Sequence, residues 1–470
     1  MTILLVSTYE LGHQPLHLAA PAAALEAAGH DVSTVDLSVE EFTDAHLRDA
    51  DRVAISVPMH TAMRLALDVA RRVRDTRTDL PVAVYGLYAG VGSDAHVGGL
   101  IDRAIEGEYL GELVDWASGG GEGLTRSLAR ERQLIPVRVD LPGLDRYARL
   151  RIDGEERLAG YLEASHGCRH RCRHCPLPVV YDGRLRVVAP DVVAADAKQQ
   201  VAAGARHLTF GDPDFLNAPP HAIRTLEAVR AAAGDDLTFD VTVKVSHVLE
   251  HRELWPRLAE LGVAFVVSAF EQADDRLLEL LDKGHTVDDM REAVGILRAA
   301  GIAVRPTWLP FTPWTEGRHL EQVVRFIDEM GLWGSVDPIQ LSIRLLIPDG
   351  SLMLDVPELT PHLRGFDADA LGHLWAPSEP AMDVLQAHLA EVVERADGDG
   401  VSDAVALQRL VDAIGGHLGT DLPPVGDPLP APRLTESWFC CAEPAARQFA
   451  ATTTRGALQV VINRVQGESA

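Results

Sequence analysis

Three of the five cysteines of this 470-residue chain lie in one short run, Cys168, Cys172 and Cys175, with the spacing C-x₃-C-x₂-C. Thiolates this close together bind soft metal ions or iron–sulfur clusters. Three thiolates on a cubane of four irons leave one iron without a protein ligand, where a cofactor could chelate. The alternative is a structural zinc site completed by His170 or His174, although zinc loops usually come as two ligand pairs and no second pair has such spacing.

The other two cysteines, Cys440 and Cys441, are adjacent and follow a proline-rich spacer over residues 422–432. Adjacent cysteines form strained, easily reduced disulfides, but they can cycle between redox states or chelate one soft centre. We predict such a functional role for the pair, with two buried small side chains as the alternative. Cysteines grouped in this way do not form a disulfide framework, which favours a reducing compartment.

The cysteine run, together with the mostly apolar stretch Leu158–Ser165 before it, resembles the cluster loop of the radical S-adenosylmethionine (SAM) superfamily. The resemblance implies a [4Fe-4S] cluster whose open iron is chelated by the amino and carboxylate groups of SAM. It also implies that one electron from the cluster cleaves a carbon–sulfur bond of the sulfonium, and that an external donor such as flavodoxin or ferredoxin supplies this electron.

Elements that could position these residues begin at the N-terminus, where residues 1–120 alternate short β-rich runs with helical patterns. The runs cover residues 3–7, 31–36, 52–56 and 81–85, and two of the helical patterns cover 16–28 and 61–77. This alternation predicts a doubly wound, flavodoxin-like α/β domain with a parallel sheet, whose ligands bind beyond the carboxyl ends of the strands.

Three segments of this first domain, residues 14–18, 25–32 and 106–113, resemble the cobalamin-binding domain that precedes many radical SAM barrels. The resemblance implies cobalamin as a further cofactor, and a retained scaffold with an empty site is the alternative. Residues 94–99 match the signature D-x-H-x-x-G, whose histidine can coordinate cobalt. Because they follow the fourth predicted strand rather than the first, where the family places the signature, we interpret the match as coincidence.

A linker over residues 121–156 leads into a second series of strand and helix patterns. After the cysteine loop, strands are predicted at residues 208–210, 238–243, 264–268, 303–308 and 340–346. Six βα units that start at the cysteine loop fit the partial (βα)6 barrel of radical SAM enzymes, here over residues 157–355, with its chemistry at the carboxyl ends of the strands. A helical C-terminal region, residues 356–470, carries the second cysteine pair.

Four side chains at predicted strand ends are candidates for contacts to SAM. Asp212 and Asp214 follow the second strand, where the family holds the SAM amino group with Gly-Gly-Glu; that motif is absent here, and an exposed acidic loop is the alternative. Ser268 and Glu271 resemble the fourth-strand segment that leads into Lys-Gly-His-Thr, found here at residues 283–286. Glu271 could instead cap the helix that follows.

Two further side chains have competing interpretations. Arg344, on the last predicted strand, could bind a carboxylate at the barrel mouth because guanidinium binds carboxylates bidentately, or it could form a salt bridge at the barrel edge. Trp308, at the end of the fifth strand, could pack on adenine or fill the core.

Charge and hydropathy narrow the partners. A formal net charge of −26 argues against nucleic acid, because affinity for nucleic acid comes largely from Lys and Arg on phosphates. No stretch of about 18 uncharged apolar residues is present, so no membrane span is predicted. The N-terminus lacks a basic region and a cleavage site, and we therefore expect a cytoplasmic protein.

The tail carries a second resemblance. Residues 440–444, Cys-Cys-Ala-Glu-Pro, resemble the ending of the CUAEP/CCAEP-tail radical SAM proteins. A neighbouring subfamily includes the arsinothricin-biosynthesis enzyme, which joins arsenite to the 3-amino-3-carboxypropyl group of SAM. By this analogy we predict a transferase that moves a SAM-derived carbon group to a soft small-molecule acceptor, such as trivalent arsenic from arsenite, held by Cys440 and Cys441. The alternatives are a cobalamin-dependent radical methyltransferase acting on a small metabolite or peptide, and a non-catalytic redox or metalloid sensor.

Overall fold

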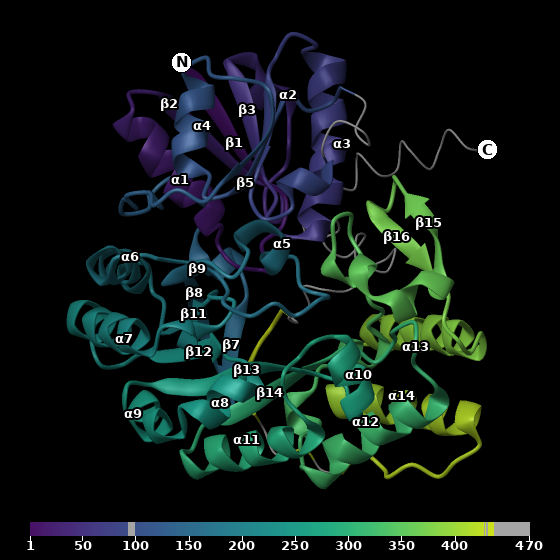
Figure 1. Cartoon of the computed structure of the whole chain (residues 1–470). Coiled ribbons are helices and arrows are strands. Elements are labelled where there is room, and N and C mark those ends of the chain that lie inside the picture. Colours follow the sequence, from purple (N-terminus) through teal and green to yellow (C-terminus); the bar gives the residue numbers. More distant parts are fainter. Residues whose placement is uncertain (93–98, 427, 429–430, 437–470) are drawn as a thin grey trace.

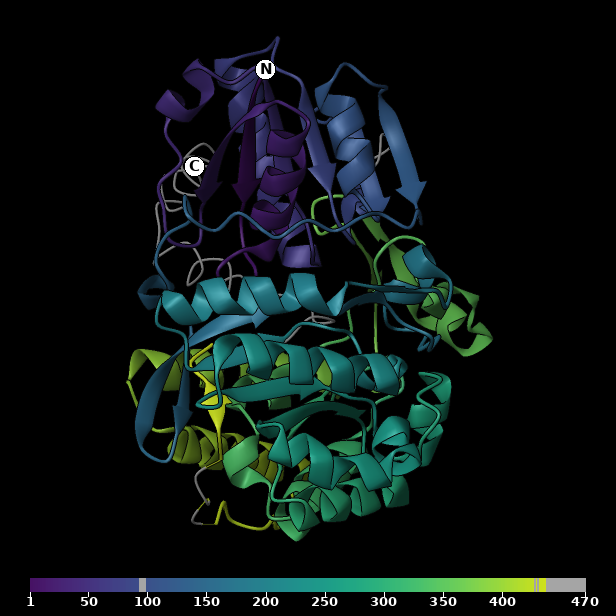
Figure 2. The same ribbon diagram turned by 90° about the vertical axis from the view of Figure 1, so that its left-hand side faces the viewer.

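The computed structural model describes residues 1–92, 99–426, 428 and 431–436. Two α/β units are stacked, with the N-terminal unit above the larger barrel unit in Figure 1 and again in the rotated view of Figure 2. The match to D-x-H-x-x-G, apart from its last glycine, and both tail cysteines lie outside the described residues. None of the described helices is long and apolar enough to cross a membrane.

The N-terminal unit contains the predicted parallel sheet, with strand order β2-β1-β3-β4-β5-β6. Every neighbouring pair in this sheet is parallel, which requires a crossover between consecutive strands. The strands are β1 (Thr2–Ser7), β2 (Asp31–Asp36), β3 (Arg52–Ser56), β4 (Val82–Tyr85), β5 (Arg103–Gly107) and β6 (Gly123–Ser127).

Helices cover both faces of this sheet. On one face, α1 (Leu16–Ala27) and α4 (Leu110–Ala117) pack on a cluster of buried side chains that includes Ile3 and Leu5. On the other face, α2 (Asp44–Arg48) and α3 (His60–Thr76) pack on a cluster that includes Leu4 and Val6. Successive side chains of a strand point to opposite faces, so the continuous apolar runs seen in the sequence reflect burial on both sides.

Strand β6 extends the N-terminal sheet past residue 120, where the sequence placed the start of the linker. This strand pairs with β5 at the sheet edge through its backbone, and no residue of β6 is fully buried. An edge strand with so little apolar burial has no clear hydrophobic pattern, which explains why it was not predicted.

The barrel unit is built on a curved sheet with strand order β14-β13-β12-β11-β8-β7-β17. The five strands from β8 to β14 are parallel, while β7 is antiparallel to β8 and β17 is antiparallel to β7. The strands are β7 (Arg149–Ile152), β8 (Glu155–Leu162), β11 (His207–Phe210), β12 (Thr238–Thr242), β13 (Val263–Glu271), β14 (Ala303–Trp308) and β17 (Arg433–Leu434).

The sixth barrel strand, predicted over residues 340–346, does not form as a continuous strand. Residues Pro338–Ser342 form a 3-10 helix, and only an isolated parallel bridge between Phe311 and Arg344 extends the sheet beyond β14. Pro338 starts this helical turn with a fixed φ, and the apolar run after it is buried in a cluster with Leu277 and Trp375 rather than in a ladder. A short apolar run does not distinguish these two outcomes.

Helices lie on the outer side of the barrel sheet (Figure 2) and share its main core. They are α6 (Pro190–Ala202), α7 (Pro219–Ala233), α8 (Val245–Glu250), α9 (Trp255–Glu260), α10 (Asp275–Leu280), α11 (Val287–Ala299) and α12 (Gly317–Glu329). A C-terminal pair, α13 (Ala381–Gly398) and α14 (Asp403–Leu418), packs on the same core. The remaining elements are α5 (Leu177–Tyr181), the pair β9 (Ser165–Gly167) and β10 (Leu185–Val187), and the hairpin β15 (Leu363–Asp367) and β16 (Gly372–Trp375).

Candidate active site

One cavity lies between the two units, where the carboxyl ends of both sheets face each other. Its volume is about 1800 Å³ when its solvent-open mouth is included. The N-terminal unit contributes Leu11, His17, Pro58, Met59, Gly86, Leu87, Tyr88, Gly107 and Tyr109 to its lining. The barrel unit contributes the three predicted cluster cysteines and most of the strand ends.

The predicted cluster ligands lie on a loop that follows β9. Cys168 and Cys172 are buried, Cys175 is partly exposed, and all three line the cavity without forming a disulfide. The loop is fixed by two backbone hydrogen bonds, from the Cys175 amide to the Cys172 carbonyl and from the Arg173 amide to the Leu281 carbonyl. The side-chain amide of Asn217 donates to the sulfur of Cys168 at 3.6 Å, while burial and the nearby Asp214 raise the pKa of this thiol.

The arrangement of the three sulfurs fits a four-iron cluster better than one zinc ion. Tetrahedral zinc would hold thiolates within about 4 Å of one another, but the described groups of ligand atoms that gather within 4.8 Å do not include these three thiols. The two histidines proposed to complete a zinc site face carboxylates instead, His174 that of Glu271 and His170 that of Asp214.

A buried ionic cluster lies beside the cysteine loop. Glu271 Oε1 accepts from Lys283 Nζ at 3.2 Å and lies 3.3 Å from His174 Nε2. Burial opposes the ionisation of Glu271, but Lys283 and His174 lower its pKa to about 2. Burial likewise opposes the charge of Lys283, yet Glu271 and the thiols of Cys172 and Cys175 raise its pKa. This ammonium group therefore stabilises negative charge on the cysteine loop.

The structure separates the two candidate carboxylates of the loop after β11. Asp214 lines the cavity. Asp212 does not. It accepts from the amide of Ala164 at 2.8 Å and from the hydroxyl of Ser165 at 2.5 Å, and so connects the loop after β11 to the start of β9. Burial raises the pKa of Asp212 to about 7. Both side chains are buried, so the loop is not the exposed acidic loop considered as the alternative.

On the fourth barrel strand, Glu271 lines the cavity whereas Ser268 does not. The Ser268 hydroxyl donates to the carbonyl of Val243 at 2.7 Å. Glu271 does not cap the next helix, because Asp274 accepts from the first amides of α10. Its contact to SAM stays a prediction that its position permits.

The last two candidates have contrasting positions. Arg344 donates to Asp383 and to the carbonyl of Trp375, and its guanidinium stacks on the Trp375 ring at 3.5 Å, away from the cavity lining. This geometry matches the barrel-edge salt bridge. Trp308 lines the cavity and also packs edge-to-face on Phe270, so it serves the core at the cavity wall.

A chain of carboxylates and imidazoles joins the two units at the cavity, and no motif in the sequence predicts it. Within the N-terminal unit, His17 Nδ1 lies 3.0 Å from Glu10 Oε2. Across the interface, His17 Nε2 lies 3.5 Å from Glu163 and His166 lies 3.1 Å from Glu108. Within the barrel unit, His166 lies 3.3 Å from Glu163. We call Glu10, His17, Glu163, His166 and Glu108 the interdomain network.

Both imidazoles of the interdomain network are held in their charged form. Burial alone would lower the pKa of His17, but Glu10 and Glu163 raise it to about 9. Glu108 and Glu163 raise the pKa of His166 in the same way, against the effect of burial. Burial opposes the ionisation of Glu163, and its two imidazole partners lower its pKa to about 2. Glu10, His17 and Glu108 are far in sequence from Glu163 and His166, so only the fold brings the two groups together.

The N-terminal side of the cavity has the backbone that a large flat ligand needs. Gly86 and Gly107 end two neighbouring strands with φ of +122° and +81°, a region that other residues rarely adopt. A Cβ at Gly107 would lie 2.2 Å from the carbonyl oxygen of Ser127, so a side chain there would displace the edge strand. Both glycines line the cavity, so backbone without a side chain forms this part of its wall.

Two histidines, His13 and His17, follow β1, and both already have partners. His13 is buried and stacks on Tyr161 with ring centroids 4.8 Å apart, outside the cavity lining. His17 lines the cavity, but both of its nitrogens face carboxylates. Cobalamin bound without a protein histidine ligand stays a prediction.

The last described residues bring the C-terminal tail to the interface between the units. Strand β17 pairs with β7, and the Arg149 amide donates to the Thr435 hydroxyl at 2.9 Å. Tyr9 then donates to Glu436 at 2.8 Å. Glu436 packs so closely on Gly12 that a Cβ there would lie 2.9 Å from the Glu436 side chain. The tail is thus anchored at the loop after β1, whose Leu11 lines the cavity.

Comparison with known families assigns both units. Residues 2–108 match the B12 binding domain, and residues 162–327 match the radical SAM superfamily. The two matches coincide with the two stacked units, one on each side of the cavity. Together with the thiols and the strand ends described above, they support a [4Fe-4S] cluster, SAM and cobalamin as cofactors.

Curated relatives include two methylases. The chain is 25% identical over 341 residues to the hopanoid C-3 methylase of Methylococcus capsulatus, covering 66% of this chain and 63% of that protein. It is 24% identical over 286 residues to the hopanoid C-2 methylase of Rhodopseudomonas palustris, covering 58% of this chain and 52% of that protein. The matches thus span between about half and two thirds of these relatives.

Solved structures share the two-unit fold. The cobalamin-dependent S-adenosylmethionine radical enzyme OxsB with aqua-cobalamin bound has a TM-score of 0.66 at 14% identity, covering 84% of this chain and 67% of that one. The radical S-adenosylmethionine methyltransferase TsrM from Kitasatospora setae, with tryptophan and aza-SAM bound, has a TM-score of 0.53 at 19% identity, covering 70% of this chain and 71% of that one.

Proposed function

We propose that this chain, in which a B12-binding domain precedes a radical SAM partial barrel, is a cobalamin-dependent radical SAM methyltransferase that acts on a small molecule. One observation carries the proposal: the cysteines of the barrel and the strand ends of the B12-binding domain line the same cavity. A methyl group can pass from one cofactor to an acceptor beside the other only where the reacting atoms meet.

In this proposal each side chain has a defined task. Cys168, Cys172 and Cys175 hold the cluster, and Lys283 stabilises their negative charge. Glu271, fixed by Lys283, orients SAM at the cluster. When bound, the cluster supplies the electron that cleaves SAM, and cobalamin carries the methyl group. The interdomain network fixes the position of the B12-binding domain, and hence of its binding site, relative to the barrel.

The two methylases among the curated relatives favour methyl transfer, while other relatives, 20–26% identical, are ribosomal protein uS12 methylthiotransferases. Both hopanoid relatives are methylases, and TsrM is a methyltransferase with the same two-unit fold. The strongly acidic chain is a poor partner for nucleic acid.

The transfer of an aminocarboxypropyl group to arsenic is a second candidate, with one observation in its favour. Glu436 anchors the tail beside the loop that contributes Leu11 to the cavity. Cys440 follows four residues later, and four extended residues reach at most about 14 Å. We place this candidate second because neither family match and neither methylase relative involves arsenic.

Analysis of the products of SAM distinguishes these functions. The full-length protein, reconstituted anaerobically with iron and sulfide, is incubated with SAM and a strong reductant, with and without cobalamin and with and without arsenite. Methyl transfer releases S-adenosylhomocysteine from the SAM that donates the methyl group, and reductive cleavage of a second SAM releases methionine and 5′-deoxyadenosine, whereas aminocarboxypropyl transfer releases methylthioadenosine. We expect S-adenosylhomocysteine that depends on added cobalamin, detected by mass spectrometry.

Each other outcome has a meaning. Methylthioadenosine with a new organoarsenical that appears only with arsenite, and is lost in a Cys440→Ser/Cys441→Ser variant, would replace methyl transfer by the second candidate. No cleavage of SAM under any condition, despite a full complement of cluster iron, would contradict both enzymatic functions and favour a sensor.

A further inference from the structure

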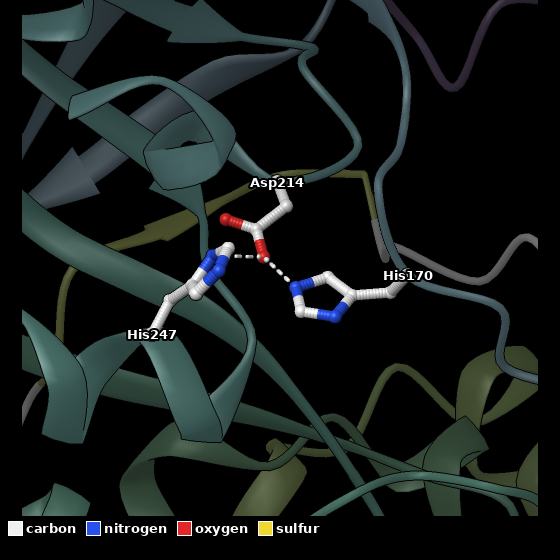
Figure 3. Close-up of side chains that lie close together, drawn as sticks. All are labelled: His170, Asp214 and His247. Carbon is white, nitrogen blue, oxygen red and sulfur yellow. Dashed lines mark ion pairs between the residues drawn. The ribbon is translucent and has the colours of Figure 1, made fainter. Parts of the chain in front are cut away.

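Two imidazoles and one carboxylate converge beside the cysteine loop (Figure 3). His170 lies within that loop, Asp214 in the loop after β11, and His247 on α8. Asp214 Oδ2 lies 2.8 Å from His247 Nδ1 and 3.4 Å from His170 Nε2. One ligand atom from each of the three residues lies within 4.8 Å of the other two. Three separate segments of the barrel unit thus present ligand atoms to one point.

The three atoms are not used elsewhere in the described part of the chain. Each is buried, and none makes a hydrogen bond of normal geometry. The other oxygen of Asp214, Oδ1, accepts from the amide of Leu216 at 3.1 Å and so fixes the carboxylate with Oδ2 facing the imidazoles. Buried polar atoms without such bonds cost free energy, and three of them at one point indicate a missing ligand.

We propose that His170 Nε2, Asp214 Oδ2 and His247 Nδ1 bind a divalent first-row transition-metal ion, such as Zn²⁺ or Fe²⁺, that is separate from the iron–sulfur cluster. Imidazole nitrogen with one carboxylate oxygen is a ligand set that such ions prefer. Ligand atoms on a tetrahedral ion are separated by about 3.4 Å. The separation between Asp214 and His170 is already 3.4 Å, and that between Asp214 and His247, 2.8 Å, needs only a small outward shift.

The position of this site indicates what the ion would do. His170 and Asp214 line the cavity between the two units, so coordination positions not taken by the protein face the cavity. Metal sites with three protein ligands keep a position for water or substrate. The ion would therefore hold an acceptor that carries an oxygen or nitrogen donor, and so select acceptors with such a group near the carbon to be modified.

The site goes beyond the proposed methyl transfer and does not depend on it. It also takes Asp214 away from the SAM contacts predicted from the sequence, because one carboxylate oxygen cannot serve both the ion and the SAM ammonium group. The two roles can be distinguished with Asp214→Asn. This substitution should weaken zinc binding if Asp214 is a metal ligand, and SAM binding if it is a SAM ligand.

Zinc binding to the cluster-loaded, full-length protein tests the site. The test is made in a Cys440→Ser/Cys441→Ser background, which removes the tail thiols as competing ligands. After incubation with Zn²⁺ and gel filtration, we expect about one zinc ion per chain by mass spectrometry, in addition to the cluster iron. His247→Ala and Asp214→Asn should each reduce the bound zinc at least about tenfold, because three-ligand sites lose most of their affinity with one ligand.

A matched control and a spectroscopic readout distinguish a metal site from a folding defect. His251 lies on the same side of the barrel, with its ring 5.5 Å from that of His247, and His251→Ala should retain zinc. Cluster iron and sulfide should be unchanged in every variant, which shows that the loop is intact. The zinc absorption edge should show only nitrogen and oxygen neighbours at about 2.0–2.2 Å.

Three results would overturn the proposal. Zinc that survives Asp214→Asn but is lost with His251→Ala would assign the ion to another group. Sulfur neighbours at about 2.3 Å would assign it to the cluster cysteines. Zinc that never binds, combined with weaker SAM binding in Asp214→Asn, would return Asp214 to SAM. Products of SAM, measured in parallel, test the proposed methyl transfer independently of all three.

Discussion

Glu271 combines features that rarely occur together in one residue. It ends a barrel strand, is buried, and has φ of +66° within a β-bulge that shifts the register of β13 against β14. A left-handed conformation costs a residue with a Cβ about 1 kcal/mol or more, and it persists only where the surroundings fix it. Here the surroundings are Lys283 and His174, which hold the carboxylate at the cavity wall.

Removal of Lys283 tests this buried cluster. In Lys283→Met, Glu271 loses its main partner and remains buried, so we expect the free energy of unfolding to fall by about 3–5 kcal/mol. The urea midpoint of the cluster-free chain measures this change. The cluster-loaded form should also retain less iron, because the loop loses a buried cation that interacts with Cys172 and Cys175.

Two further variants show whether the effect belongs to the pair. Lys198→Met changes an exposed lysine on α6 and should leave the urea midpoint unchanged. Adding Glu271→Gln to Lys283→Met removes the uncompensated charge and should restore part of the loss. A Lys283→Met protein as stable as the wild type would contradict the buried pair.

At residue scale, the sequence supports a prediction where candidate ligands are neighbours in the chain. Cys168, Cys172 and Cys175 fall within eight residues, so their spacing predicted a shared metal or cluster site, and the three thiols line one cavity. Contacts made across the fold gave no such signal. Glu10 and Glu163 approach the same imidazole from different units, and nothing in either segment predicts the other.

At the scale of elements, the same contrast holds for strands. Strands buried on both faces, such as β1 and β11, were predicted because their apolar runs are continuous. The edge strand β6 and the short strand β17 depend on backbone pairing with a neighbour, which leaves little trace in side-chain pattern. The apolar run near Leu345 predicted a strand, but its side chains are buried in a loop-rich cluster instead.

Docking of the first helix on the barrel should depend on pH. His17 begins α1 and faces Glu10 and Glu163, with His166 on the far side of Glu163 and Tyr109 nearby. Its pKa is about 9 in the fold against an ordinary value of 6.5. The stabilisation from its charge is therefore complete below pH 6.5 and is lost as the pH rises through 9.

The urea midpoint, measured from pH 6 to pH 10, checks this dependence. Wild-type stability should decline across the window from about pH 6.5 to 9, and the decline should be smaller in His17→Gln. His388→Gln, which changes an exposed histidine on α13, should keep the wild-type decline. A His17→Gln protein with an unchanged profile would show that His17 does not couple the two units.

At the scale of the whole molecule, two α/β units form one cavity that is lined by residues of both. The sequence predicted both units and the edge of each where ligands bind, because helix and strand alternation specifies a parallel sheet. Their relative placement depends on contacts such as the buried pair of Arg138 and Asp196, whose two side chains approach to 2.6 Å. Periodicity carries no information on such contacts, so the shared cavity required the structure.

The proximity of the two cofactors is the central claim, and electron paramagnetic resonance tests it directly. The full-length protein is loaded with cluster and with cobalamin in its cobalt(II) form, and the cobalt signal is recorded before and after reduction of the cluster. If both cofactors face the one cavity, reduction should broaden or split the cobalt signal, and a Cys168→Ala protein should lose this effect. A cobalt signal that is unchanged when the cluster becomes paramagnetic would place the cofactors in separate sites and contradict the account.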